Sequence, residues 1–270
     1  MRQLLYFITF ILLLASCRNQ DNRAPIGSAL GSIIKGCWVK SDYIADLIKT
    51  KSPFISSDKL RDAGIVALSI DPGKMSGDSL AAQAIWNNHE GYTFCLYNKS
   101  CHTTNTLLTN INDYQHKDNV YDLGYIEKGK DTFLVLYHLG SNMRVLDSAI
   151  YSRVQKHTNT TAAEGIACIT NNILITGSYK MIDSIGNEAT LHFSDDGKVA
   201  GFLTYTSFYI GTDFIDPTQI DYISFRKGND STDIDYYFQI RNEEIRLFET
   251  KEDKDGALLK GKLKYVLKKQ

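Results

Sequence analysis

A short polar cluster between two expected strands contains the residues best suited to chemistry. The segment Asn87-Asn88-His89-Glu90-Gly91 is flanked by Trp86 and Tyr92. A histidine beside a carboxylate at the end of a strand can move a proton or bind a metal. Adjacent residues on extended backbone point to opposite faces, so His89 and Glu90 reach one ligand only in a special turn. A hydrated hairpin loop is therefore the favoured interpretation, with His89 and Glu90 as the candidate polar site.

Three aspartates follow a segment rich in tyrosine and phenylalanine: Asp213, Asp216 and Asp221. Paired carboxylates beside aromatic rings suit a glycosidase or a sugar-binding protein. The sequence contains no Gly-x-Ser-x-Gly elbow, His-Glu-x-x-His helix, Gly-rich phosphate loop or Cys-x-x-Cys pair. No two histidines have the spacing of metal ligands. These patterns favour a non-catalytic protein that uses neither a metal nor a cofactor.

Aromatic side chains gather in two further places, around an expected short helix and in the segment that precedes the aspartates. Such rings can line the mouth of a barrel, where an apolar ligand enters. They can equally fill the interior of a large β-core. The candidate ligand-binding residues are Tyr43, Phe54, Tyr205, Phe208, Tyr209 and Phe214.

Residues 1–16 have the pattern of a signal peptide. A basic start precedes an apolar run from Leu4 to Ala15, which is short for a permanent bilayer span. The run ends at Leu14-Ala15-Ser16-Cys17, which resembles the bacterial lipobox. This resemblance implies cleavage before Cys17, with a diacylglycerol on its sulfur. Residues 17–32 are then a lipidated polar tether, and the expected location is the bacterial cell envelope with the membrane as a partner.

The remaining cysteines are Cys37, Cys95, Cys101 and Cys168. Export would permit disulfides. Cys95 and Cys101 flank a turn-like segment and are the one candidate pair across a hairpin. Free thiols are the favoured interpretation, and Cys37 is expected in the core beside Trp38.

Short alternating apolar runs separated by turn residues extend through the rest of the chain, a pattern typical of antiparallel sheets and barrels. The 16 tyrosines and 12 phenylalanines also favour pleated strands over helices. The expected fold is therefore all-β, with one short amphipathic helix at 43–51. The expected strands are 33–41, 64–71, 79–86, 92–98, 106–111, 120–127, 132–139 and 144–154, then 173–183, 189–194, 199–210, 220–227, 234–241, 244–251 and 259–269.

A polar stretch at 155–171, with at most one helical turn, divides the chain into two β-units, 33–155 and 172–270. The halves share a weak internal repeat, in which Gly36-Cys37-Trp38 corresponds to Gly177-Ser178-Tyr179. Two arrangements fit this pattern. Either each half closes its own sheet as one of two tandem units, or one barrel or sandwich uses strands from both halves.

The second half resembles the small lipocalin-like lipoproteins of bacterial envelopes. The resemblance rests on Gly177-Ser178-Tyr179 entering a strand, on the segment ATLHFSDDGKVAG, and on a terminal strand that ends in basic residues. In such proteins a Gly-x-Trp on the first strand packs across the closed end of the barrel. Here the tryptophan is Trp38, in the first half, whereas Tyr179 stands in its place in the second. The resemblance implies antiparallel lipocalin-like barrels.

The formal net charge of −1 supplies no global field that would recruit nucleic acid, so no nucleic-acid partner is expected. The sequence thus predicts a lipid-anchored protein of the cell envelope. We expect it to bind a small apolar or amphipathic ligand, or to act as an interaction module for an envelope protein. The alternative is an envelope hydrolase that acts through loop carboxylates.

Overall fold

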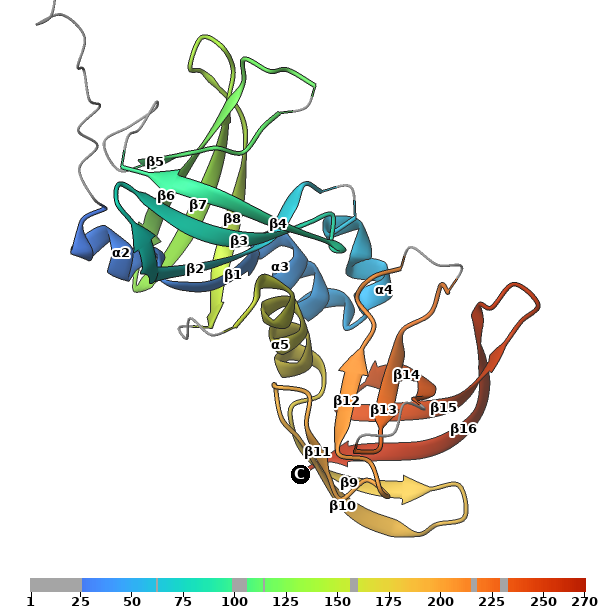
Figure 1. Ribbon diagram of the computed structural model, residues 1–270. Helices are drawn as coiled ribbons and strands as arrows, with labels where there is room; N and C mark the ends of the chain where they lie inside the picture. Colours follow the sequence, from blue (N-terminus) through green and yellow to red (C-terminus); the bar gives the residue numbers. More distant parts are fainter. Residues whose placement is uncertain are drawn as a thin grey trace, which may run out of the picture.

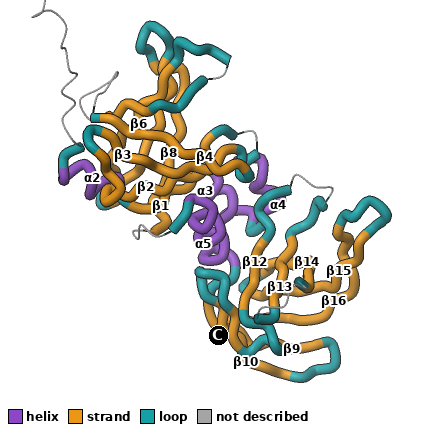
Figure 2. Tube along the Cα trace, viewed as in Figure 1, coloured by secondary structure: helices purple, strands orange, loops and turns teal. Residues whose placement is uncertain are grey.

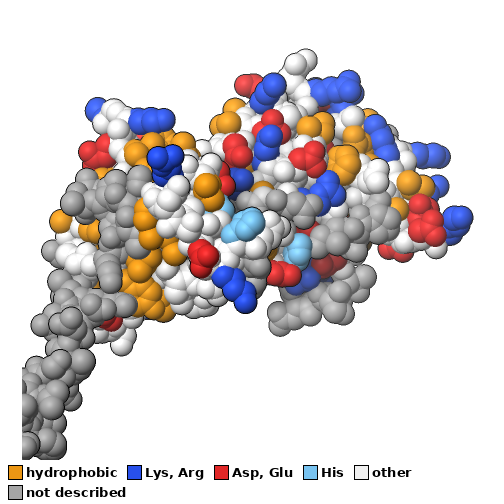
Figure 3. Space-filling model, turned by 90° about the horizontal axis from the view of Figure 1, so that it is seen from above, with side chains coloured by type: hydrophobic (Ala, Val, Ile, Leu, Met, Phe, Trp, Pro, Cys, Tyr) orange, Lys and Arg blue, Asp and Glu red, His pale blue; other side chains and the backbone are white. Residues whose placement is uncertain are grey.

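The structure is a computed structural model that describes residues 26–61, 63–98, 106–113, 115–155, 160–214, 218–228 and 233–270. It contains a closed antiparallel β-barrel, a second antiparallel sheet, and a group of helices between them (Figures 1 and 2). The predicted all-β class with an antiparallel barrel is confirmed. Figure 3 shows acidic and basic side chains interspersed over one face of the molecule.

The barrel is a meander of eight strands in which each strand pairs with the next and the last pairs with the first. Alternation of apolar and polar residues places one set of side chains inside and the other outside. Leu134 and Leu136 belong to the barrel core in this way. The strands are β1 (Gly36–Lys40), β2 (Ile65–Ser76), β3 (Ser79–Trp86), β4 (Glu90–Tyr97), β5 (Thr106–Thr109), β6 (Val120–Lys128), β7 (Asp131–Leu139) and β8 (Val145–Gln155).

Helix α2 (Ser28–Ile34) covers the end of the barrel where β1 begins. Trp38 is fully buried beneath it and donates its indole N–H to the Ile34 carbonyl at 2.8 Å. The guanidinium of Arg153 stacks over the Trp38 ring at 4.4 Å. The Gly-x-Trp of the first strand therefore packs beneath α2 at this end of the barrel. The predicted tether at 17–32 includes the first residues of this helix.

The second sheet uses strands of the second half only, in the order β11-β10-β9-β16-β15-β14-β13-β12. Its two edge strands approach each other through an antiparallel bridge between Lys198 and Ser207. The Phe208 N–H also donates to the Gly197 carbonyl at 2.7 Å. The strands are β9 (Gly177–Asp183), β10 (Glu188–Phe193), β11 (Val199–Ala200), β12 (Ser207–Ile210), β13 (Tyr222–Arg226), β14 (Ile234–Arg241), β15 (Glu244–Glu252) and β16 (Leu258–Lys269).

The single strand predicted at 199–210 is wrong, because the chain leaves the sheet after β11 and returns only at β12. Gly201 has a φ of 79°, and a Cβ there would lie 2.1 Å from the Thr190 carbonyl oxygen. Only glycine fits this bend. The bend places Phe202 in the interior of the second sheet, where its ring packs 4.6 Å from that of Phe225.

Four short α-helices occur in the described part of the chain, where the sequence predicted one. The predicted helix is confirmed as α3 (Ser41–Thr50) and is followed by α4 (Pro53–Ser56) and a 3-10 helix, η1 (Ser57–Lys59). The predicted polar stretch at 155–171 instead leads into α5 (Ala162–Leu174). No helix of these described segments is both long and apolar enough to cross a membrane.

A capping box starts α5, and this is the signal that the sequence interpretation missed. The Thr161 hydroxyl accepts a hydrogen bond from the Glu164 N–H at 3.2 Å, and the Glu164 carboxylate accepts one from the Thr161 N–H at 2.7 Å. Ser/Thr-x-x-Glu before an apolar run is the sequence mark of such a start. Ile166, Ile169 and Ile173 then follow at helical spacing and pack into the core.

One hydrophobic core joins the two sheets through these helices. It includes Val39 and Leu47 of the first half together with Phe193 and Leu247 of the second. The barrel interior forms a separate cluster around Trp38. Helices α3 and α5 thus belong to the junction between the two sheets, and α5 contacts strand β12 at the edge of the second sheet.

Candidate functional site

A pocket of about 400 Å³ lies between α5 and the seam where the edges of the second sheet meet. One wall is a face of α5, the opposite wall is the tight turn between β10 and β11, and strand β12 forms the floor. The lining residues are Thr160, Glu164, Ala167, Cys168, Asn171, Asp195, Asp196, Gly197, Phe208 and Tyr209.

The helical wall follows from the period of the helix. Glu164, Ala167, Cys168 and Asn171 are spaced three or four residues apart and so share one face of α5. Cys168 is 8% exposed, and its thiol donates to the Asp195 carboxylate at 3.4 Å. This contact joins the helix to the opposite wall. Ala167 has the smallest side chain of the four and leaves the space that forms the pocket.

Asn171 joins the same two walls at the inner end of the helical face. It is 3% exposed, and its side-chain N–H donates to the Asp195 carbonyl at 3.0 Å. Its Oδ1 is buried and accepts no hydrogen bond from any group in the described residues. A buried acceptor without a partner costs about 1–3 kcal/mol. Asn171, which lines the pocket, therefore carries a buried acceptor without a partner among the described residues.

The floor and the turn combine apolar and acidic surface. Phe208 is buried and packs edge-on against Phe193, whereas its neighbour Tyr209 is 46% exposed. This difference follows from the alternation of side chains along β12. In the turn, the Asp196 carboxylate pairs with Lys198. Hydrogen bonds from the Lys198 ammonium and the Ser194 hydroxyl lower the pKa of Asp196.

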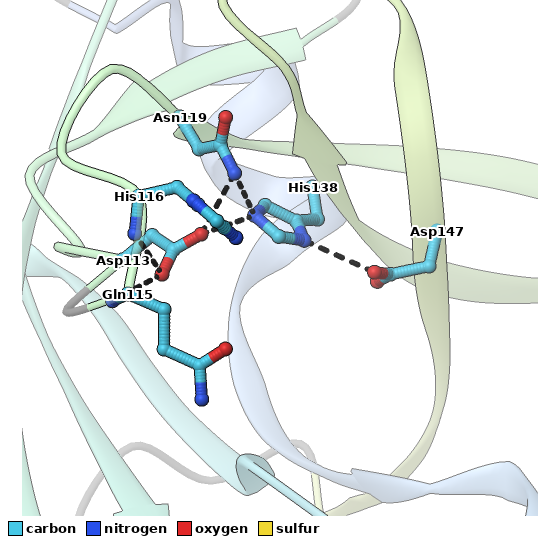
Figure 4. A network of polar contacts seen from close by, with 6 residues as sticks. All are labelled: Asp113, Gln115, His116, Asn119, His138 and Asp147. Atoms are coloured by element: carbon cyan, nitrogen blue, oxygen red, sulfur yellow. Dashed lines mark hydrogen bonds and ion pairs between the residues drawn. The ribbon is translucent and has the colours of Figure 1, made fainter.

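A second polar cluster surrounds His138 in the barrel (Figure 4). Its Nε2 lies 3.0 Å from the Asp113 carboxylate, and its Nδ1 lies 3.0 Å from that of Asp147. The Tyr121 ring stacks on the imidazole with a centroid separation of 4.5 Å. The Asn119 amide nitrogen also lies 3.2 Å from Nε2. Both ring nitrogens are therefore engaged, which suits a structural role better than proton transfer to a substrate.

Asp113 holds the β5–β6 loop against this histidine. Desolvation favours the neutral carboxyl, but it is outweighed by hydrogen bonds from the Asn119 side chain and from the backbone N–H groups of His116 and Gln115. Together with His138 they lower the pKa of Asp113 to about 2. The sequence offered no signal that Asp113 and His138 come together.

The six aromatic residues predicted to bind a ligand are divided between the core and the pocket. Phe208 and Tyr209 line the pocket. The Tyr43 hydroxyl is buried in a hydrogen bond of 2.8 Å with Thr170. The ring centroids of Phe54 and Phe214 lie 5.3 Å apart.

Tyr205, the remaining member of the set, packs 5.5 Å from Phe202 in the second sheet. Its phenol ring is half-buried and belongs to the fringe of the hydrophobic core that joins the two sheets. The structure thus brings two of the six predicted side chains to one cavity.

The polar candidates lie apart from this pocket. His89 and Glu90 are exposed at the turn between β3 and β4. Asp221 accepts a hydrogen bond of 2.8 Å from the Phe54 N–H, and its burial raises the pKa of its carboxyl. Asp213 lines a small recess beside Phe214. Asp216 lies outside the described residues.

The cysteines in the described ranges are free thiols, with Cys37 and Cys168 buried and Cys95 half-buried. Cys17 and Cys101 lie outside these ranges, as does the predicted signal peptide. Across the same ranges, no group of three or more histidine, cysteine or acidic side chains could hold a metal ion.

Comparison with known proteins found no matching family model, no matching curated protein and no matching solved structure.

Proposed function

We propose that the chain is a lipid-anchored protein of the bacterial cell envelope that binds a small amphipathic molecule in the pocket beneath α5. The observation that carries this proposal is the pocket of about 400 Å³, which sets aromatic surface beside carboxylates. Ligand sites are typically concave, mostly apolar cavities of about 300–1,000 Å³ with a few polar groups that fix orientation. The face of α5 that lines the pocket supplies both apolar surface, at Ala167, and polar groups, at Glu164 and Asn171.

The filled interior of the barrel supports placing the ligand beneath α5. Trp38, Leu68, Phe94 and Tyr151 lie in that interior and are almost completely buried. A barrel packed by its own side chains acts as a scaffold for the elements outside it. In this chain the barrel supports α5, and α5 forms one wall of the pocket.

Filling the pocket is expected to abolish binding. Replacing Ala167 with phenylalanine places a ring in the cavity, whereas Ala163→Phe puts the same ring on the exposed side of the same helix. We expect one molecule of a small amphiphile, 3-phenylpropanol or 3-phenylpropylamine, to bind the unmodified chain and the Ala163 variant. The affinity of the Ala167 variant should fall at least about tenfold, equal to ~1.4 kcal/mol. Isothermal titration of the full chain in nanodiscs measures this, and equal binding by both variants would contradict the pocket.

Replacing Cys17 with serine is expected to release the protein from the membrane or to mislocalise it, because a lipobox sulfur carries the anchor. One acyl chain binds a membrane marginally, whereas two or more anchor stably. Fractionation of cells that express each form measures the distribution, with Cys95→Ser as the matched control. A Cys17 variant that stays in the membrane fraction unchanged would show that the lipobox interpretation is wrong.

A further inference from the structure

We infer that the pocket beneath α5 selects a cationic head group that donates hydrogen bonds, a primary ammonium or a guanidinium, attached to a short apolar tail. This inference rests on the proposed function, because it names the ligand class of the same pocket. It depends on three observations: the charge of the lining residues, the buried acceptor of Asn171, and the position of the aromatic surface.

The charged groups that line the pocket are all acidic. Glu164, Asp195 and Asp196 contribute carboxylates, and no lysine, arginine or histidine occurs among the described lining residues. Lys198 is the cation of the same turn, and it is already paired with Asp196. The surplus of negative charge favours a cation and repels a carboxylate or phosphate.

The N-terminus of α5 does not reverse this preference. A free helix N-terminus attracts anions, because its first N–H groups have no partner within the helix. Here the Thr161 hydroxyl takes up the Glu164 N–H, and the Glu164 carboxylate takes up the Thr161 N–H. The end of the helix that faces the pocket therefore also carries a carboxylate, which opposes the binding of an anion there.

Asn171 independently indicates that the head group of the ligand donates hydrogen bonds. Its Oδ1 is shielded from water and accepts no hydrogen bond within the described part of the chain, although Asn171 lines the pocket. Its amide nitrogen is held by the Asp195 carbonyl. An ammonium or guanidinium N–H is the complement to this acceptor and to the carboxylates, whereas a quaternary ammonium has no N–H to offer.

The apolar surface of the pocket indicates where the tail of the ligand lies. Ala167 provides carbon surface on the helical wall, and Tyr209, which is 46% exposed, provides aromatic surface on the floor. A ligand with its cation at the carboxylates and an aryl or short alkyl tail along Ala167 and Tyr209 satisfies both parts of the pocket. An aromatic ring beside the cation also favours binding through its quadrupole.

Four probes with one tail and different head groups test this inference: 3-phenylpropylamine, its N,N,N-trimethyl derivative, 3-phenylpropanol and 3-phenylpropanoate. They are titrated calorimetrically into the full chain in nanodiscs, with empty nanodiscs as the baseline. We expect the primary amine to bind at least about tenfold more tightly than the alcohol and about fivefold more tightly than the trimethyl derivative, with no binding of the carboxylate.

A charge-neutral variant separates the head group from the fold. Glu164→Gln removes one negative charge and keeps the capping box, because glutamine serves at this position. Its amine affinity should fall at least about threefold, and by a larger factor than its alcohol affinity. Glu127→Gln, on an exposed strand end of the barrel, is the matched control and should leave both affinities unchanged.

The possible results distinguish this inference from the proposed function. Equal binding of all four probes, lost in the Ala167→Phe variant, leaves the pocket in place and overturns the head-group preference. Tighter binding of the carboxylate or of the trimethyl derivative also overturns it. Binding of no probe overturns both the head-group inference and the pocket.

Discussion

Replacing Trp38 with alanine is expected to lower the free energy of unfolding by about 3–5 kcal/mol, the usual cost of deleting a large buried aromatic side chain. The indole is fully buried, and its N–H donates to the Ile34 carbonyl at the end of α2. The Arg153 guanidinium stacks on the Trp38 ring, and burial lowers the pKa of the guanidinium. Truncation therefore leaves a cavity, an unpaired carbonyl and an arginine without its stacking partner.

A phenylalanine at this position separates the hydrogen bond from the ring. Trp38→Phe keeps aromatic surface below Arg153 and loses the N–H donor, so we expect a smaller cost of about 1–3 kcal/mol. Urea unfolding followed by far-UV circular dichroism measures both variants, and Trp86→Phe in the β3–β4 region is the control. A Trp38→Ala variant as stable as the control would contradict the closed end formed by α2 and β1.

The strands were predictable because most of them bury one face. Where apolar and polar residues alternate, as in β3 and β14, the pattern identified the strand to within a residue or two. Turn residues separate the strands, as at Gly129 between β6 and β7, whose φ is 65°. The strand at 199–210 failed because its apolar run continues through Gly201, where the backbone must bend.

The helix α5 could not be inferred from apolar periodicity alone. Its sequence, AAEGIACITNNIL, mixes good helix formers with glycine, threonine and asparagine, which are typical of loops. Tertiary packing compensates for this weak propensity, since the helix lies between two sheets and buries residues such as Ile166 and Thr170. The capping box was the usable local signal.

The candidate site was only partly predictable, because its residues come from segments that lie far apart along the chain. Phe208 and Tyr209 were chosen as aromatic residues, but Asn171 and Cys168 come from a helix that had not been predicted. The His138 cluster shows the same limit. His138 and Asp147 face each other because β7 and β8 pair in one register, and a strand pattern alone does not specify register.

Helix α5 packs on the barrel at Gly165, and replacing this glycine with alanine is expected to have the second large effect on stability. A Cβ added there would lie 2.1 Å from the Cys37 sulfur of β1, whereas the next nearest atoms, the Cys37 Cβ and a Val154 methyl, lie at 3.4 and 3.5 Å. Overpacking of this kind costs about 1–3 kcal/mol. Replacing glycine by alanine within a helix returns about 1 kcal/mol through propensity. The steric cost exceeds this gain in helix propensity, so Gly165→Ala is expected to destabilise the chain.

Removing the Cys37 sulfur should reverse the sign of the stability change that Gly165→Ala causes. In Cys37→Ala the clashing atom is gone and the remaining contacts are ordinary, so adding Gly165→Ala to this variant should be neutral or stabilising by up to about 1 kcal/mol. The four unfolding free energies of this double-mutant cycle, measured in urea, give the coupling directly. Because α5 forms a wall of the ligand pocket, the single Gly165 variant should also bind the amine probe more weakly, and the double variant should recover that binding. Additive effects of the two substitutions would show that α5 does not rest on β1 at Cys37.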